Sequence, residues 1–154
     1  MNEYFYRGIE EFKRVDHLIF VSLKYTRSVD VIRSCIERLI NGYDALMEGL
    51  LMKAKDEGKI DKLPVSPGIR CDKVSIFYED DEVIQDYMDF YMLLRKMYIG
   101  KFTRASEFRR GVTMTVIVDK QFMEVNIDII TEYYKRSLEF IEHVKPILPD
   151  APEA

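Results

Sequence analysis

Residues 28–58 read SVDVIRSCIERLINGYDALMEGLLMKAKDEG, and this stretch decides the fold. Apolar residues recur along it at intervals of three and four, namely Ile32, Cys35, Leu39, Tyr43, Leu46 and Leu50. That spacing is typical of one face of an α-helix. Ser28 is a good N-cap, Asp30 favours the dipole in the first turn, and Gly58 is a typical stop signal. The stretch therefore predicts one helix about 40 Å long, at about 1.5 Å per residue.

Three other segments show helical spacing and predict helices around this one. The first covers about 3–26, the next begins at Asp80 or Asp81 and ends at Gly100, and the last covers about 127–144. The last helix has an expected apolar stripe of Ile127, Ile130, Tyr134, Leu138, Ile141 and Val144.

Two connecting segments are interpreted from their breakers and caps. Residues 62–73 contain Pro64 and the Pro67–Gly68 pair, so we expect a loop there. Residues 101–110 predict a short further helix with Thr103 as its N-cap.

The hydrophobic period changes from helical spacing to strict alternation between residues 113 and 126. Many residues of this window are β-branched, which favours strands. A four-residue loop at 119–122 pairs Val118 with Met123, Val116 with Val125, and Met114 with Ile127, so that all three pairs share one face. A bent helix is the competing interpretation, because Met and Glu are good helix formers.

These elements predict a mainly α fold, a single-domain helical bundle of four to five helices over residues 1–148. A small β-hairpin at about 113–126 precedes the last helix, and residues 149–154 are expected to be a disordered tail. The chain has 154 residues, 47% of them apolar and 32% charged, which is enough for one folded domain and argues against disorder.

The composition also limits location and source. The longest apolar runs are well short of the roughly 20 residues that a membrane helix needs, and the N-terminal residues lack the order of a signal peptide. We therefore expect a cytoplasmic protein with no membrane partner. The abundance of Glu, Lys and Arg is compatible with a thermophilic source.

Neither a metal nor another cofactor is expected. Cys35 and Cys71 do not have the spacing of a metal-binding pair, and Cys35 falls on an apolar stripe where a buried thiol is usual. A disulfide between them is the alternative. The acidic run at 79–82 precedes a predicted helix, where carboxylates offset the dipole, although a divalent cation is a competing interpretation. The sequence contains no Gly-rich phosphate loop.

Residues 95–111, RKMYIGKFTRASEFRRG, concentrate positive charge in a chain whose net charge is −4. Six cations accompany the single acid Glu107, namely Arg95, Lys96, Lys101, Arg104, Arg109 and Arg110. Tyr98, Phe102 and Phe108 lie between them, and cations interleaved with aromatics are what phosphate attraction and base stacking require. The alternative is a solvated helix end whose cations favour the dipole and pair with surface acids.

Arg136 and His143 lie seven positions apart and share one helix face, where they could converge on a phosphate. Periodicity places both on the polar face beside Glu139, which can hydrogen-bond His143. The bundle layout and the segment Arg136-Ser-Leu-Glu-Phe-Ile-Glu-His143 resemble HEPN-like domains, small helical bundles of which some are ribonucleases with an Arg-x(4–6)-His motif. The resemblance implies a metal-independent ribonuclease in which His143 is the general acid or base and Arg136 stabilises the phosphorane charge.

The function expected from the sequence is a non-enzymatic interaction or scaffold module that forms a homodimer. Ten tyrosines and eight methionines support an interface, because tyrosine joins an apolar body to a polar tip and methionine adapts its shape. The alternative is an RNA-binding or RNA-cleaving protein. It would hold phosphate with the basic stretch at 95–110 and carry out chemistry with Arg136 and His143.

Overall fold

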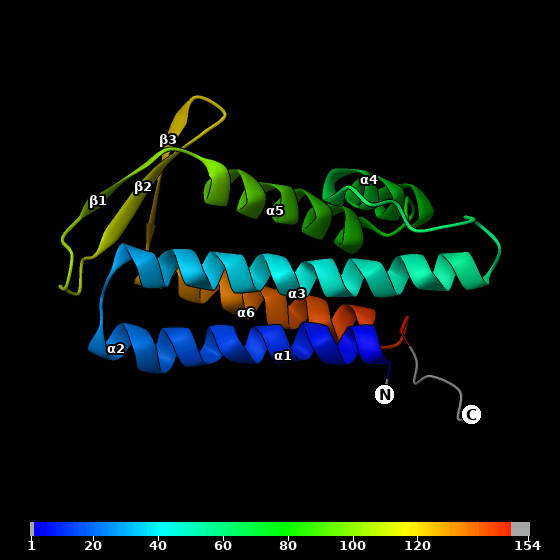
Figure 1. Ribbon diagram of the computed structural model, residues 1–154, viewed down its shortest axis with the longest axis horizontal. Helices are drawn as coiled ribbons and strands as arrows, with labels where there is room; N and C mark the ends of the chain where they lie inside the picture. The colour runs from blue at the N-terminus through cyan, green and yellow to red at the C-terminus, as the bar shows by residue number, and fades with distance from the viewer. Residues whose placement is uncertain (1, 149–154) are drawn as a thin grey trace.

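Helix α3 (Val29–Asp56) lies at the centre of the computed structural model, which describes residues 2–148 (Figure 1). Helices α1, α4, α5 and α6 all pack against it. Fifteen of its 28 residues are buried, so the buried surface extends well beyond the single stripe expected from the sequence. Ser28 is its N-cap, as predicted, and accepts a hydrogen bond from the Val31 N–H at 3.2 Å.

The helix predicted over residues 3–26 is confirmed, with a π-helical segment inside it. It consists of α1 (Glu3–His17), the π-helix η1 (Leu18–Ser22) and a last turn, α2 (Leu23–Tyr25). α1 packs closely on α3, because Gly42 faces the Phe12 ring with no side chain of its own between them. A Cβ at Gly42 would lie 2.2 Å from a ring carbon of Phe12, so this crossing requires glycine.

Helix α4 (Pro67–Phe77) corrects the loop predicted for residues 62–73. Pro67 does not break a helix here but begins one, because the first turn of a helix needs no N–H donor. Cys71 and Val74 are buried on its inner side. Both cysteines are free, so the disulfide alternative is wrong. Burial raises the pKa of Cys71 to about 11 and that of Cys35 to about 12, so neither thiol is activated.

Helices α5 (Glu82–Ile99) and α6 (Ile127–Val144) match their predicted bounds. Asp81 caps α5 by accepting from the Ile84 N–H at 3.0 Å, and Asn126 caps α6 by accepting from the Ile129 N–H at 2.9 Å. Gly100 follows α5, where a Cβ would lie 2.6 Å from the carbonyl oxygen of Ile117.

The buried side of α6 differs from the predicted stripe. Leu138 is 41% exposed, whereas Ser137 and Phe140 are buried. The difference arises because α6 packs against both α1 and α3, which turns the buried arc toward Ser137. Its hydroxyl lies 2.8 Å from the buried hydroxyl of Tyr43, so each polar group has a partner.

A three-stranded antiparallel sheet precedes α6, with strand order β1-β2-β3. The strands are β1 (Phe102–Ala105), β2 (Thr113–Val118) and β3 (Gln121–Asn126). The short helix predicted for residues 101–110 is wrong, and Thr103 lies in β1 rather than at a helix N-cap. β1 forms because β2 offers it a hydrogen-bonding edge, with Phe102 opposite Val116 and Ala105 opposite Thr113.

The hairpin of β2 and β3 is confirmed, but its register differs by two residues from the predicted one. Val118 pairs with Gln121, Val116 with Met123, and Met114 with Val125. Asp119 and Lys120 both have positive φ, 49° and 66°, so a two-residue turn replaces the expected four-residue loop. A shift of two residues keeps the same side chains facing the core.

The tail predicted at 149–154 lies outside the described residues. Within residues 2–148, none of the helices combines the length and apolar character that a membrane crossing requires.

The close crossing of α1 and α3 predicts that Gly42→Ala destabilises the fold by about 3 kcal/mol or more, since a buried methyl group would overlap the Phe12 ring. Gly68→Ala is the matched control, because a Cβ there meets nothing closer than 3.8 Å. Urea unfolding measures both variants. Equal stability of the two variants would contradict the close crossing.

Candidate functional site

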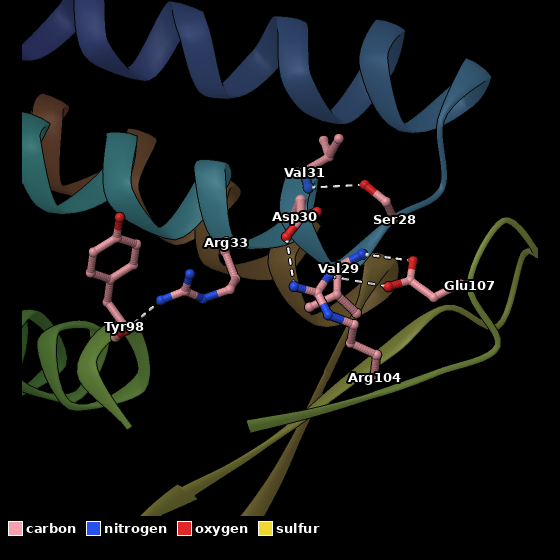
Figure 2. Close-up of polar contacts among 8 residues, drawn as sticks. All are labelled: Ser28, Val29, Asp30, Val31, Arg33, Tyr98, Arg104 and Glu107. Atoms are coloured by element: carbon pink, nitrogen blue, oxygen red, sulfur yellow. Dashed lines mark hydrogen bonds and ion pairs between the residues drawn. The ribbon is translucent and has the colours of Figure 1, made fainter. Parts of the chain in front are cut away.

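The loop at residues 106–112, between β1 and β2, folds back onto the start of α3 (Figure 2). Glu107 Oε2 accepts a hydrogen bond from the Val29 N–H at 3.2 Å. This N–H belongs to the first turn of α3, where backbone donors have no partner within the helix. The start of α3 is therefore satisfied partly by Ser28 and partly by a carboxylate from the loop.

Arg104 holds this junction together from the sheet side. Its guanidinium lies 2.9 Å from an Asp30 carboxylate oxygen and 3.3 Å from Glu107 Oε1 (Figure 2). Ion pairs this exposed stabilise a fold little. Their effect is on geometry, because they give the carboxylates of Asp30 and Glu107 a partner at the start of α3.

The backbone of the loop is strained at two positions. Ser106 and Phe108 have φ of 56° and 64°, a region that residues with a Cβ avoid. The strain costs on the order of 1–3 kcal/mol for each residue. Phe108 is held in place because its N–H donates to the carbonyl oxygen of Arg27 at 2.7 Å. The ring of Phe108 remains 72% exposed.

Arg33 joins α3 to α5 and β1. Its guanidinium lies over the rings of Tyr98 and Phe102, 4.7 and 4.5 Å from their centroids, and donates to the carbonyl oxygen of Tyr98 at 2.7 Å. The Tyr98 hydroxyl in turn donates to Glu37 at 2.7 Å. Two of the three aromatics that the sequence offered for base stacking are thus occupied within the protein.

The basic stretch divides into paired and unpaired cations. Lys96 pairs with Asp119 at 3.0 Å, and Arg104 pairs as described above. Arg95 is half-buried, with its guanidinium 5.9 Å from the centroid of the Tyr91 ring. Lys101, Arg109 and Arg110 are exposed and form no ion pair within residues 2–148.

Arg136 lies on the exposed side of α6, as predicted. Its guanidinium is 4.4 Å from the centroid of the Phe90 ring, and its backbone carbonyl accepts from the Tyr87 hydroxyl at 2.7 Å. It borders a shallow pocket of about 250 Å³, which Asp86 and Asp89 also line. The carboxylates beside this guanidinium make the pocket a poor place for a phosphate.

His143 pairs with Asp81 and not with Glu139. Its Nε2 lies 2.8 Å from Asp81 Oδ2, so α6 is fastened to the start of α5. Burial favours a higher pKa for Asp81, but the hydrogen bonds from His143 and from the Ile84 N–H outweigh it and lower that pKa. His143 does not line the pocket that Arg136 borders.

The acidic and histidine positions show no metal-binding arrangement. Within the described part of the chain, no group of three or more His, Cys, Asp or Glu side chains is placed to hold a metal ion. Asp81 caps α5, in keeping with the dipole interpretation. Asp16, which precedes His17 in the chain, accepts from the Tyr134 hydroxyl at 2.9 Å.

Sequence reasoning missed the residues that lie beside the β1–β2 loop. The hydrogen bond from the Phe108 N–H to the Arg27 carbonyl oxygen brings the segment that ends α2, with Lys24, Tyr25 and Arg27, to the loop that carries Arg109 and Arg110. No local pattern announces this contact, because it joins segments far apart in the sequence.

No family model, curated protein or solved structure matches this chain. Its function is therefore inferred from the geometry of its own residues.

The loop contact predicts that Glu107→Ala lowers the free energy of unfolding by about 1–2 kcal/mol, because Val29 loses its acceptor. Glu124→Ala, at an exposed position of β3, is the control and should change it by less than about 0.5 kcal/mol. Chemical denaturation measures both. A neutral Glu107 variant would mean that the loop does not support α3.

The lowered pKa of Asp81 predicts a specific pH dependence. A carboxyl with a lower pKa in the folded state stabilises the fold above its ordinary pKa, near 3.8, and this stabilisation is lost as pH falls through the folded value. Asp81→Asn keeps a capping side chain but does not titrate. The wild type should lose more stability than Asp81→Asn between pH 6 and pH 3 in urea titrations. Parallel pH profiles would contradict this.

Proposed function

We propose that the chain is a non-enzymatic interaction module of HEPN-like layout that acts as a cytoplasmic homodimer. The observation that supports it is an exposed apolar surface, the η1–α6 surface, in which the exposed side chains of Phe20 and Leu138 flank the buried Tyr134. Phe20 is 52% exposed, and its ring meets the Tyr134 ring edge-on at 6.3 Å. Leu138 extends this surface one turn further along α6.

The surface suits a second copy because its charges are self-complementary. Lys135 precedes Leu138 by three residues and Glu142 follows it by four, so all three share one side of α6. A two-fold axis near Leu138 would bring Lys135 of each copy beside Glu142 of the other. The adjacent π-helix η1 supports an interface, since such segments are frequent at functional positions.

RNA cleavage by Arg136 and His143 stays a prediction of the HEPN-like resemblance. Asp81 holds Nε2 of His143, so proton transfer to RNA would have to use Nδ1 or follow release of His143 from Asp81. The geometry thus favours a structural part for His143 and self-association for the chain.

Sedimentation velocity over a concentration series tests the dimer. Leu138→Glu should raise the dimer dissociation constant at least tenfold, because it places two like charges at the axis. Lys135→Glu should weaken the dimer, and adding Glu142→Lys should restore it by re-forming the pair with the signs exchanged.

Val65→Glu is the control, since Val65 is an exposed apolar residue in the loop before α4, away from this surface. It should leave the dimer unchanged. A wild-type protein that sediments as a monomer at several hundred micromolar would end the proposal.

A further inference from the structure

Two segments distant in sequence meet at one end of the molecule, where the chain passes from α2 to α3 (Figure 1, left). The contact is the hydrogen bond from the Phe108 N–H to the carbonyl oxygen of Arg27, 2.7 Å long. It places the end of α2 beside the β1–β2 loop. We name six residues of the two segments that flank this contact the tip cluster: Lys24, Tyr25, Arg27, Phe108, Arg109 and Arg110.

The tip cluster carries an excess of positive charge. Its four cations form no ion pair with any carboxylate between residues 2 and 148. The two adjacent acids, Asp30 and Glu107, share the single guanidinium of Arg104, so one negative charge remains beside the four cations and the tip stays positive. A concentrated positive end on a chain of net charge −4 is complementary to a polyanion.

The tip cluster also presents two aromatic rings to water. Tyr25 is 80% exposed and Phe108 is 72% exposed. Phe108 keeps its outward position at the cost of a left-handed backbone, which the bond to Arg27 and the inward contact of Glu107 sustain. Strain that keeps an apolar ring in solvent indicates a use for that ring.

We propose that the tip cluster binds single-stranded nucleic acid. Unpaired bases stack on Tyr25 and Phe108, and the cations contact the phosphates. Stacking rings beside cations are how proteins hold single strands without reading their sequence, because every base has a π-face. A duplex would offer the cations its phosphates but would keep its bases from the rings. This function is separate from self-association, which uses the η1–α6 surface.

The proposal changes the residue set expected from the sequence. Arg109 and Arg110 remain in it, whereas Lys96 and Arg104 are paired within the protein. Lys101 lies at the other end of β1, opposite Ile117. The residues added to the set are Lys24, Tyr25 and Arg27, which lie at the end of α2 and just after it, outside the basic stretch.

Fluorescence anisotropy with a labelled 12-nucleotide oligouridylate tests the proposal. Affinity should fall as salt rises from about 50 to 200 mM, with a slope of about 0.7 per phosphate contact. The double variant Arg109→Gln/Arg110→Gln should reduce that slope by about 1.4. Tyr25→Ala and Phe108→Asn should each weaken binding about tenfold with little change in slope, Asn being chosen because it tolerates positive φ.

Two exposed residues outside the tip cluster serve as matched controls. Lys62→Gln removes a cation from the loop after α3, and Phe122→Ala removes an exposed ring at the far end of the hairpin. Both should bind as the wild type does. Oligodeoxyuridylate, run in parallel, separates a site that takes both nucleic acids from one that requires the ribose hydroxyl, and either result supports single-strand binding.

Several results would overturn the proposal. One is that oligouridylate does not bind at about 50 mM salt. Another is that a duplex binds as tightly as the single strand and that neither ring variant loses affinity. A third is that the two control variants lose as much affinity as the tip variants. A change of sedimentation in the tip variants with unchanged RNA binding would assign this end to self-association instead. Thermal unfolding checks each variant, and Tyr25→Ala, at a solvent-exposed position, keeps the test valid should Phe108→Asn fold poorly.

Discussion

The unpartnered N–H groups at the first turn of α3 are the constraint that organises one end of this protein. A helix leaves these donors unsatisfied, and here Ser28 and Glu107 accept from two of them. Because Glu107 belongs to the loop between β1 and β2, satisfying α3 also fixes the sheet against the bundle. The same loop then turns Phe108 outward beside Arg27.

The two proposed interactions use separate surfaces with different chemistry. The η1–α6 surface is apolar with opposite charges on either side of Leu138, which suits an identical partner. The tip cluster is cationic and aromatic, which suits a polyanion with unpaired bases. Both stand on rigid elements, helices in one case and a doubly anchored loop in the other, so neither requires a large rearrangement to bind.

Sequence alone predicted the elements whose signals are local. Caps such as Ser28 and Asp81 and the hydrophobic periods set the long helices and the hairpin close to their observed bounds. Pro67 was ambiguous, because proline both ends helices and begins them. β1 was missed because its conformation comes from pairing with β2. The tip cluster was missed because the contact between Phe108 and Arg27 joins segments that are distant in the sequence.

Amide hydrogen exchange at Val29 and Phe108 tests the junction most directly. A first-turn helix amide and an amide in an exposed loop ordinarily exchange fast, since neither has a stable acceptor. With Glu107 and Arg27 as acceptors, both amides should instead be protected nearly as strongly as the interior of α3. Exchange of both at the rate of an unstructured chain would contradict the junction and the tip cluster built on it.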